Sequence, residues 1–145
     1  METLDQFLDR YDAAFATGEL ADRLALFDTD AVVVIGTGQD EVARGQAAVC
    51  AMLASEREVS GRYRLDWLWR EASDVCACAT VVGEAYVLFR DLSPARDPGP
   101  MRLRVSLVLV RAGDRWVIRT SHASVPALAQ RQGGFVPDPA TVRLV

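Results

Sequence analysis

The chain contains a single histidine, His122, in the last strand-like run of the sequence. An imidazole near its ordinary pKa exchanges protons at neutral pH, so His122 is the best candidate for a general acid or base. Alternation along the run predicts that its side chain points inward, beside Val105, where burial would lower its pKa and favour the neutral form. A lone histidine on an apolar face is also commonly structural. His122 is therefore predicted to be either catalytic or part of the core.

Aromatic and small residues share one predicted sheet face and form the second candidate feature. Large rings beside small residues can leave a cavity, although rings of the first helix could equally fill that space as ordinary packing. Tyr11 and Tyr63 carry hydroxyl groups that need partners if buried, and either could orient a ligand carbonyl. The residues predicted to line the cavity are Tyr11, Phe15, Tyr63, Trp67, Trp69, Gly83 and Val105.

Carboxylates near the predicted mouth are weaker candidates. Asp30 precedes a strand, and Asp40 and Glu41 stand in a loop, which are ordinary turn or solvated positions. Gly36 and Gly38 lack the third glycine and the following helix of a dinucleotide site, so that site is excluded. No Gly-x-Ser-x-Gly motif occurs, so no nucleophile elbow is expected.

Composition excludes further classes of protein. A chain of 145 residues fits one domain. Its 16 basic residues are all Arg and are spread along a chain of net charge -4, so no nucleic-acid partner is expected. The absence of Lys excludes Schiff-base and P-loop chemistry. One His and no Cys-x-x-Cys motif leave no recognisable metal site, and no cofactor is expected.

The three cysteines, Cys50, Cys76 and Cys78, favour a reducing compartment. The first five residues are acidic where a secretory signal would be basic, so a cytoplasmic location without membrane association is expected. Cys76 and Cys78 share one face of a predicted strand, which is poor geometry for a mutual disulfide. We expect the cysteines to be buried as small apolar side chains.

Hydrophobic periodicity predicts three helices followed by a sheet. Short connections at 72–74 and 112–114 make the later strands antiparallel neighbours, whereas the Pro-rich segment 93–100 is a longer loop. In order, the predicted elements are a helix over 4–17 capped by Thr3, a short helix near 20–25, a strand over 31–35, a helix over 46–58, and strands over 62–71, 75–90, 101–111 and 115–124.

The two faces of the predicted sheet differ. The inward face is apolar and must be covered by the helices. The outward face mixes Arg and Glu with Val, Leu and Tyr, which is more apolar than a solvated face should be. It therefore predicts a homodimer through this face, with a monomer as the alternative. Strict alternation places Trp69, Thr120 and His122 inward and Arg70, Arg119 and Ser121 outward.

The order of elements and two local segments resemble the SnoaL-like branch of the nuclear transport factor 2-like superfamily. The segments are IGTGQDE at 35–41, followed by Arg44-Gly45, and WVIRTSHASVP at 116–126. The resemblance implies an α+β fold in which three N-terminal helices pack on a curved, mostly antiparallel sheet, a cone-shaped, cystatin-like roll. It places the domain at 1–128 and a C-terminal extension at 129–145.

The resemblance implies several functions, since relatives include ketosteroid isomerases, cyclases, dehydratases, epoxide hydrolases and kinase association domains. Many relatives have two histidines flanking one residue on the last strand; here Thr120 takes the first position and His122 the second. The arginines predicted to face outward disfavour the epoxide hydrolase type.

The favoured expectation is a small bacterial-type dimer that binds an apolar or aromatic molecule. As an enzyme it would be a cofactor-free isomerase, cyclase or dehydratase, in which His122 moves the proton and Tyr63 or Tyr11 polarises the oxygen. The alternatives are a non-catalytic ligand-binding or dimeric assembly domain, and a stress-related accessory protein without a small ligand.

Overall fold

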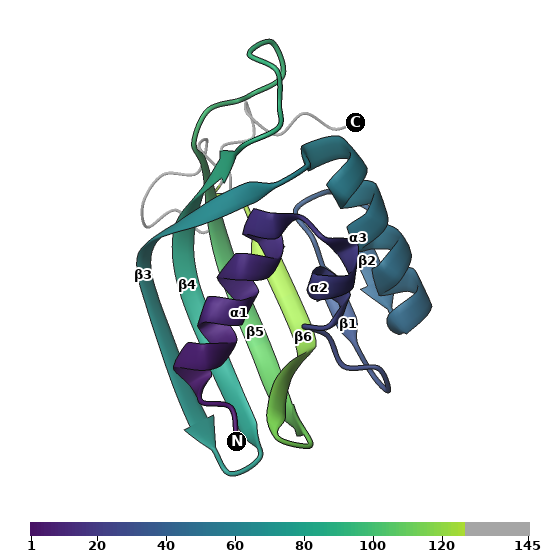
Figure 1. Ribbon diagram of the computed structural model, residues 1–145, viewed down its shortest axis with the longest axis vertical. Helices are drawn as coiled ribbons and strands as arrows, with labels where there is room; N and C mark the ends of the chain where they lie inside the picture. Colours follow the sequence, from purple (N-terminus) through teal and green to yellow (C-terminus); the bar gives the residue numbers. More distant parts are fainter. Residues whose placement is uncertain (127–145) are drawn as a thin grey trace, which may run out of the picture.

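Three helices lie against one face of a six-stranded sheet, which confirms the expected α+β fold (Figure 1). The computed structural model describes residues 1–126, so the expected extension over 129–145 lies outside the described residues. The strand order is β2-β1-β6-β5-β4-β3, and all neighbours are antiparallel except β1 and β6. The elements are α1 (Leu4–Thr17), α2 (Leu20–Leu24), β1 (Val33–Ile35), β2 (Val42–Arg44), α3 (Gln46–Ser60), β3 (Tyr63–Val75), β4 (Cys78–Phe89), β5 (Met101–Ala112) and β6 (Arg115–Ser124).

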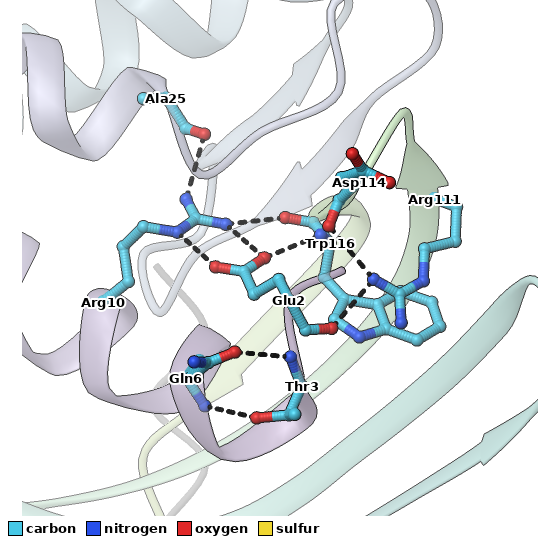
Figure 2. Close-up of polar contacts among 8 residues, drawn as sticks. All are labelled: Glu2, Thr3, Gln6, Arg10, Ala25, Arg111, Asp114 and Trp116. Carbon is cyan, nitrogen blue, oxygen red and sulfur yellow. Dashed lines mark hydrogen bonds and ion pairs between the residues drawn. The ribbon is translucent and has the colours of Figure 1, made fainter.

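Helix α1 begins at the predicted cap. The Thr3 hydroxyl accepts from the Gln6 amide at 3.2 Å, and the Gln6 side chain accepts from the Thr3 amide at 2.8 Å, which completes a capping box (Figure 2). The helix ends at Gly18, whose φ of 75° is readily adopted only by glycine. Its apolar stripe is buried, and this stripe consists of Phe7, Leu8, Tyr11, Ala14 and Phe15.

Strand β2 is the element that the sequence did not predict. It covers only three residues, too few for a periodic pattern, and it forms by antiparallel pairing with β1 across the 36–41 loop. Strand β1 in turn pairs in parallel with β6, so β2 and β3, which are consecutive strands in the chain, lie at opposite edges of the sheet.

The β3–β4 hairpin is longer than predicted. Its turn lies at Cys76 and Ala77, not at 72–74, because Cys76 adopts the left-handed φ of 57° that a two-residue turn requires. Cys76 and Cys78 are exposed at this turn, so the expectation that they are buried is wrong, while Cys50 is half-buried.

A bulge in β3 reverses the facing of part of the strand. The register shifts between Trp67 and Trp69, and one inserted residue turns every later side chain to the other face. Trp69 is consequently 47% exposed. Arg70 points toward α1 and donates to Asp12 at 3.2 Å. The predicted inward orientation of Trp69 and outward orientation of Arg70 are both wrong.

A second bulge has the same effect in β6, where Arg119 is the extra residue. His122 pairs with Ser106 on the outward face and is exposed, and Thr120 also faces outward. Ser121 points inward instead. The predicted inward orientations of His122 and Thr120 and the outward orientation of Ser121 are therefore wrong.

An ion pair holds the β6 bulge in place. Arg119 Nε donates to Asp28 Oδ2 at 2.5 Å, and Asp28 Oδ1 accepts from the Asp30 amide at 3.0 Å. The hydrogen bond from the Asp30 backbone and the bond from Arg119 outweigh burial and lower the pKa of Asp28. Asp28 is thus an anion that fixes the extra residue of the strand.

The N-terminus is clamped onto the β5–β6 hairpin (Figure 2). The Glu2 carboxylate accepts from Arg10 at 2.9 and 3.1 Å and from the Trp116 amide at 2.7 Å. Arg10 also donates to the Trp116 carbonyl at 2.7 Å. The Glu2 amide donates to the Asp114 carbonyl at 2.8 Å, and Arg111 donates to the Glu2 carbonyl at 2.9 Å. The clamp therefore fixes the start of α1 against the sheet.

Replacing Glu2 with Gln is expected to reduce the free energy of unfolding by about 1–3 kcal/mol at pH 7, because it removes charge-assisted hydrogen bonds. Burial raises the pKa of Glu2, but the bonds from Arg10 and from the Trp116 backbone outweigh it and lower the pKa. Because its pKa is lowered, the Glu2 carboxylate stabilises the fold at pH values above its unfolded pKa of about 4.3, and this stabilisation is lost as the pH falls through its folded pKa. In urea unfolding from pH 7 to 3, the free energies of unfolding of the wild type and of Glu2→Gln should therefore converge. An equal loss in the exposed Asp9→Asn variant would contradict this role.

Candidate functional site

A cavity of about 480 Å³ opens between the helices and the inward face of the sheet. Its wall is largely apolar and comes from α1, the start of β3, the end of β4 and the first half of β5. Its rim comes from the exposed 36–41 loop and from the second half of α3. The lining residues that bear on its chemistry are Tyr11, Phe15, Phe27, Asp40, Glu41, Glu56, Tyr63, Phe89, Val105, Ser121 and Ala123.

The structure brings four of the predicted site residues together in this cavity, namely Tyr11, Phe15, Tyr63 and Val105. The Phe15 and Tyr63 rings stack with centroids 5.1 Å apart, and Tyr11 meets Phe15 edge-on at 5.1 Å. Val105 lies beside Ala123, the inward residue of β6, and not beside His122 as predicted. The aromatic rings thus form one wall.

The other predicted residues lie elsewhere. His122 and Trp69 face outward, as described above. Trp67 is on the inward face but outside the cavity lining, and its indole N–H donates to the Asp12 carboxylate at 3.0 Å. Gly83 lies under the Trp67 ring. The pairing of a large with a small residue therefore fills space here, whereas the sequence predicted that it would leave a cavity.

Replacing Gly83 with Ala is expected to reduce the free energy of unfolding by about 1–3 kcal/mol through overpacking. A Cβ at Gly83 would lie 2.6 Å from Trp67 Cζ3 and 2.9 Å from the Trp69 carbonyl oxygen, a backbone atom at the β3 bulge. Gly113→Ala cannot serve as a control, because Gly113 has a positive φ at which an alanine would itself be strained. In chemical denaturation, Gly83→Ala should cost less free energy of unfolding in a Trp67→Leu background than in the wild type. An equal cost in both backgrounds would show that Trp67 is not the obstacle.

A carboxylate, a phenol and a buried guanidinium meet at the cavity wall. The Tyr63 hydroxyl donates to Glu56 Oε1 at 2.7 Å. Arg23 is 0% exposed, its Nη1 lies 3.8 Å from the same oxygen, and its Nη2 donates to the Gly61 carbonyl at 2.8 Å. The guanidinium carbon lies 5.1 Å from the Phe15 ring centroid and 5.4 Å from that of Tyr63. Glu56 is therefore held from two sides.

This environment sets the protonation of the site. Burial raises the pKa of Glu56, and the Tyr63 hydrogen bond and the Arg23 charge only partly offset it. Burial, followed by the Glu56 charge, raises the pKa of Tyr63 and of Tyr11, so both phenols stay protonated at neutral pH. Glu56 can accept or release a proton, whereas the protonated tyrosines can offer hydrogen bonds to a ligand but cannot act as bases.

Sequence reasoning missed Glu56 and Arg23, although a signal was present. Glu56 follows Leu53 by three residues and Val49 by seven, which places it on the buried stripe of α3. Arg23 stands three residues after Leu20 in α2. A charged residue at a core position of an amphipathic helix marks a buried ionisable group, and here two such positions face each other.

Tyr11 offers the one free phenol of the wall. It is 7% exposed, and its hydroxyl makes no hydrogen bond to another residue within 1–126. The Tyr63 hydroxyl, in contrast, is committed to Glu56. A polar ligand atom entering the cavity would therefore find its donor at Tyr11.

Within residues 1–126, no three or more His, Cys, Asp or Glu side chains are grouped in a way that could hold a metal ion. None of the helices described is long and apolar enough to cross a membrane.

The fold and the cavity define the class: α+β proteins in which helices and a curved, mostly antiparallel sheet enclose a pocket. The family model of the SnoaL-like domain matches residues 4–128, and the chain belongs to this family. No curated protein sequence matches the chain significantly.

Solved structures of the same fold share little sequence with the chain. A proposed dehydratase of the NTF2-like family from Streptomyces avermitilis is 16% identical, with a TM-score of 0.73 over 86% of this chain and 94% of that one. A proposed calcium/calmodulin-dependent protein kinase type II association domain from Thiobacillus denitrificans is 22% identical, with a TM-score of 0.68 over 88% and 98%. An NTF2-like protein with a cystatin-like fold from Novosphingobium aromaticivorans is 14% identical, with a TM-score of 0.66 over 89% and 82%. At this identity the likeness concerns the fold alone.

Proposed function

We propose that this protein binds a small apolar or aromatic molecule in the cavity and catalyses a cofactor-free proton transfer beside a carbonyl group of that molecule. The observation that carries the proposal is the Glu56 carboxyl group, which has a raised pKa and is bonded by Tyr63 at 2.7 Å in an aromatic cavity. Acid–base catalysis needs a group of this kind. The likeness to a proposed dehydratase is compatible with it.

The proposed roles follow from the hydrogen bonds. Ionised Glu56 removes a proton from the carbon next to the carbonyl, the electron pair of the broken C–H bond moves to the carbonyl oxygen, and the free Tyr11 hydroxyl stabilises that oxygen. Where a double bond of the ligand is conjugated with the enolate, returning the proton to the far carbon of that double bond completes an isomerisation. Loss of a β-hydroxyl group as water, protonated by the same carboxyl, instead completes a dehydration. Tyr63 and Arg23 position Glu56.

This proposal changes the roles expected from the sequence. His122 was expected to move the proton, but it is exposed on the other face of the sheet. Tyr63 or Tyr11 was expected to polarise the oxygen, and the Tyr63 proton is already donated to Glu56. In the proposal Glu56 therefore takes the role expected of His122, and Tyr11 is the tyrosine that polarises the oxygen.

A second candidate function is an assembly domain, and the outward sheet face favours it. This face exposes several large apolar side chains, namely Leu68, Trp69, Val82 and Val108. At its centre Glu84 is buried between Arg102 and Arg104. We propose that two copies pair through this face in either function, and that the protein is cytoplasmic, as its free cysteines favour.

Native mass spectrometry of the freshly purified protein, with a denaturing run of the same sample, tests the binding and the dimer. A dimer with an extra mass that is lost on denaturation would support both. Carbon-bound deuterium uptake by a panel of cyclic and aromatic ketones in D₂O then tests the proton transfer. Deuterium uptake by none of them and no retained mass would favour the assembly domain, and a clean monomer would contradict the outward interface.

A further inference from the structure

The rim of the cavity is acidic. Asp40 and Glu41 of the 36–41 loop and Glu56 of α3 line the cavity, and no Arg or His is among the lining residues within 1–126. Glu56 has Arg23 as a counterion at 3.8 Å. Asp40 and Glu41 form no ion pair in the described part of the chain. Their two negative charges are therefore unbalanced at the mouth.

The loop is built to hold the Glu41 carboxylate in place. The Gly38 amide donates to Glu41 Oε2 at 2.8 Å, and the Gly36 amide donates to the Glu41 carbonyl at 2.8 Å. A Cβ at Gly36 would collide with Glu41 Oε2, and one at Gly38 would lie 2.9 Å from Glu41 Cδ. The two glycines of the IGTGQDE segment thus let this side chain fold back over its own loop. Its charge reaches Glu56, whose pKa it raises.

The inner wall suits a cation as well as an apolar ring. Five aromatic residues line the cavity, which are Tyr11, Phe15, Phe27, Tyr63 and Phe89. Aromatic ring faces attract organic cations, and Arg23 already lies over two of these rings. Tyr11 is more than nine-tenths buried, and its hydroxyl lacks a hydrogen-bond partner among the described residues. This hydroxyl can therefore donate to a neutral polar atom of the ligand inside the cavity.

We infer that the ligand is an organic ammonium compound, with an apolar or aromatic body in the cavity and its positive charge at the Asp40–Glu41 rim. An anionic ligand would meet three carboxylates and no lining cation, which disfavours carboxylates, phosphates and coenzyme A thioesters. This inference rests on the proposed function, because it assigns a ligand class to the same cavity.

Three naphthalene probes that differ in charge test the inference by isothermal titration calorimetry at pH 7 and low salt. They are 2-naphthylmethylamine, 2-naphthalenemethanol and 2-naphthoate. The amine is expected to bind at least tenfold more tightly than the alcohol, and the naphthoate more weakly than either. Added salt should reduce the preference for the amine, since the rim carboxylates are exposed.

A double variant, Asp40→Asn with Glu41→Gln, tests whether the preference for the amine comes from the two rim carboxylates. It should reduce the preference for the amine over the alcohol at least threefold and leave the affinity for the alcohol unchanged. Glu58→Gln removes an exposed carboxylate from α3 outside the cavity lining and serves as the matched control. An unchanged preference in the double variant would overturn the role of the rim. Binding of the alcohol without preference for the amine would overturn the charge inference alone, whereas binding of none of the probes would overturn the proposed function with it.

Discussion

Replacing Glu56 with Gln is expected to lower the rate of carbon-bound deuterium uptake by about 10²- to 10⁴-fold, the usual contribution of a general base. The amide keeps the shape of the side chain and can still accept from the Tyr63 hydroxyl at Oε1, but it cannot take a proton from carbon. The measurement is the exchange rate in D₂O of the ketone that the wild-type protein labels fastest, followed by proton NMR.

The matched control is His122→Ala. His122 is exposed on the outward face, so its loss is expected to leave the rate within about twofold of wild type, in the range of surface substitutions that touch no reacting group. A large loss in His122→Ala with little change in Glu56→Gln would reverse the assignment. Circular dichroism and the unfolding midpoint of both variants separate a lost fold from a lost base.

The role of Glu56 as the base can also be tested through its hydrogen bond from Tyr63. Burial raises the pKa of Glu56, and this hydrogen bond partly offsets that effect. Tyr63→Phe removes it, so the pKa of Glu56 should rise. Because the ionised form is the base, the acid limb of the rate profile should move to higher pH while the rate on the plateau is largely retained. A merely structural Tyr63 would change the rate without moving that limb.

Replacing Trp116 with Ala is expected to reduce the free energy of unfolding by about 3–5 kcal/mol, as for other large-to-small changes in a core. Trp116 is 1% exposed, and the Arg111 guanidinium carbon lies 3.7 Å from its ring centroid. Its backbone amide and carbonyl also hold Glu2 and Arg10 in the N-terminal clamp (Figure 2). The cavity left by the ring would therefore loosen the contact between α1 and the sheet.

Two further variants are compared with Trp116→Ala in guanidinium or urea unfolding. Trp116→Phe should cost much less, because the indole N–H of Trp116 has no hydrogen-bond partner in the described residues and its removal leaves no bond broken. Trp69→Ala should cost under about 1 kcal/mol in the monomer, since Trp69 is largely exposed on the outward face. Similar losses for Trp69→Ala and Trp116→Ala in the monomer would contradict the outward orientation of Trp69.

The sequence by itself determined the order of the helices and of the long strands. Helix α1 with its Thr3 cap, the α3 helix and the four long strands follow from local periodicity and turn chemistry, which act within a few residues. The family resemblance was also available from the 35–41 and 116–126 segments, and the match over residues 4–128 confirms it. The aromatic wall of Tyr11, Phe15 and Tyr63 followed from the same periodicity.

Only the tertiary structure decided which chemistry the cavity holds. Two inserted residues, one in β3 and Arg119 in β6, turned Trp69 and His122 outward. A bulge depends on partners far away in the chain, here the Asp28 carboxylate on Arg119, and no alternation pattern encodes it. In the same way, Glu56 and Arg23 become a pair only when α2 packs on α3, because the pKa of a carboxyl group depends on what surrounds it in space.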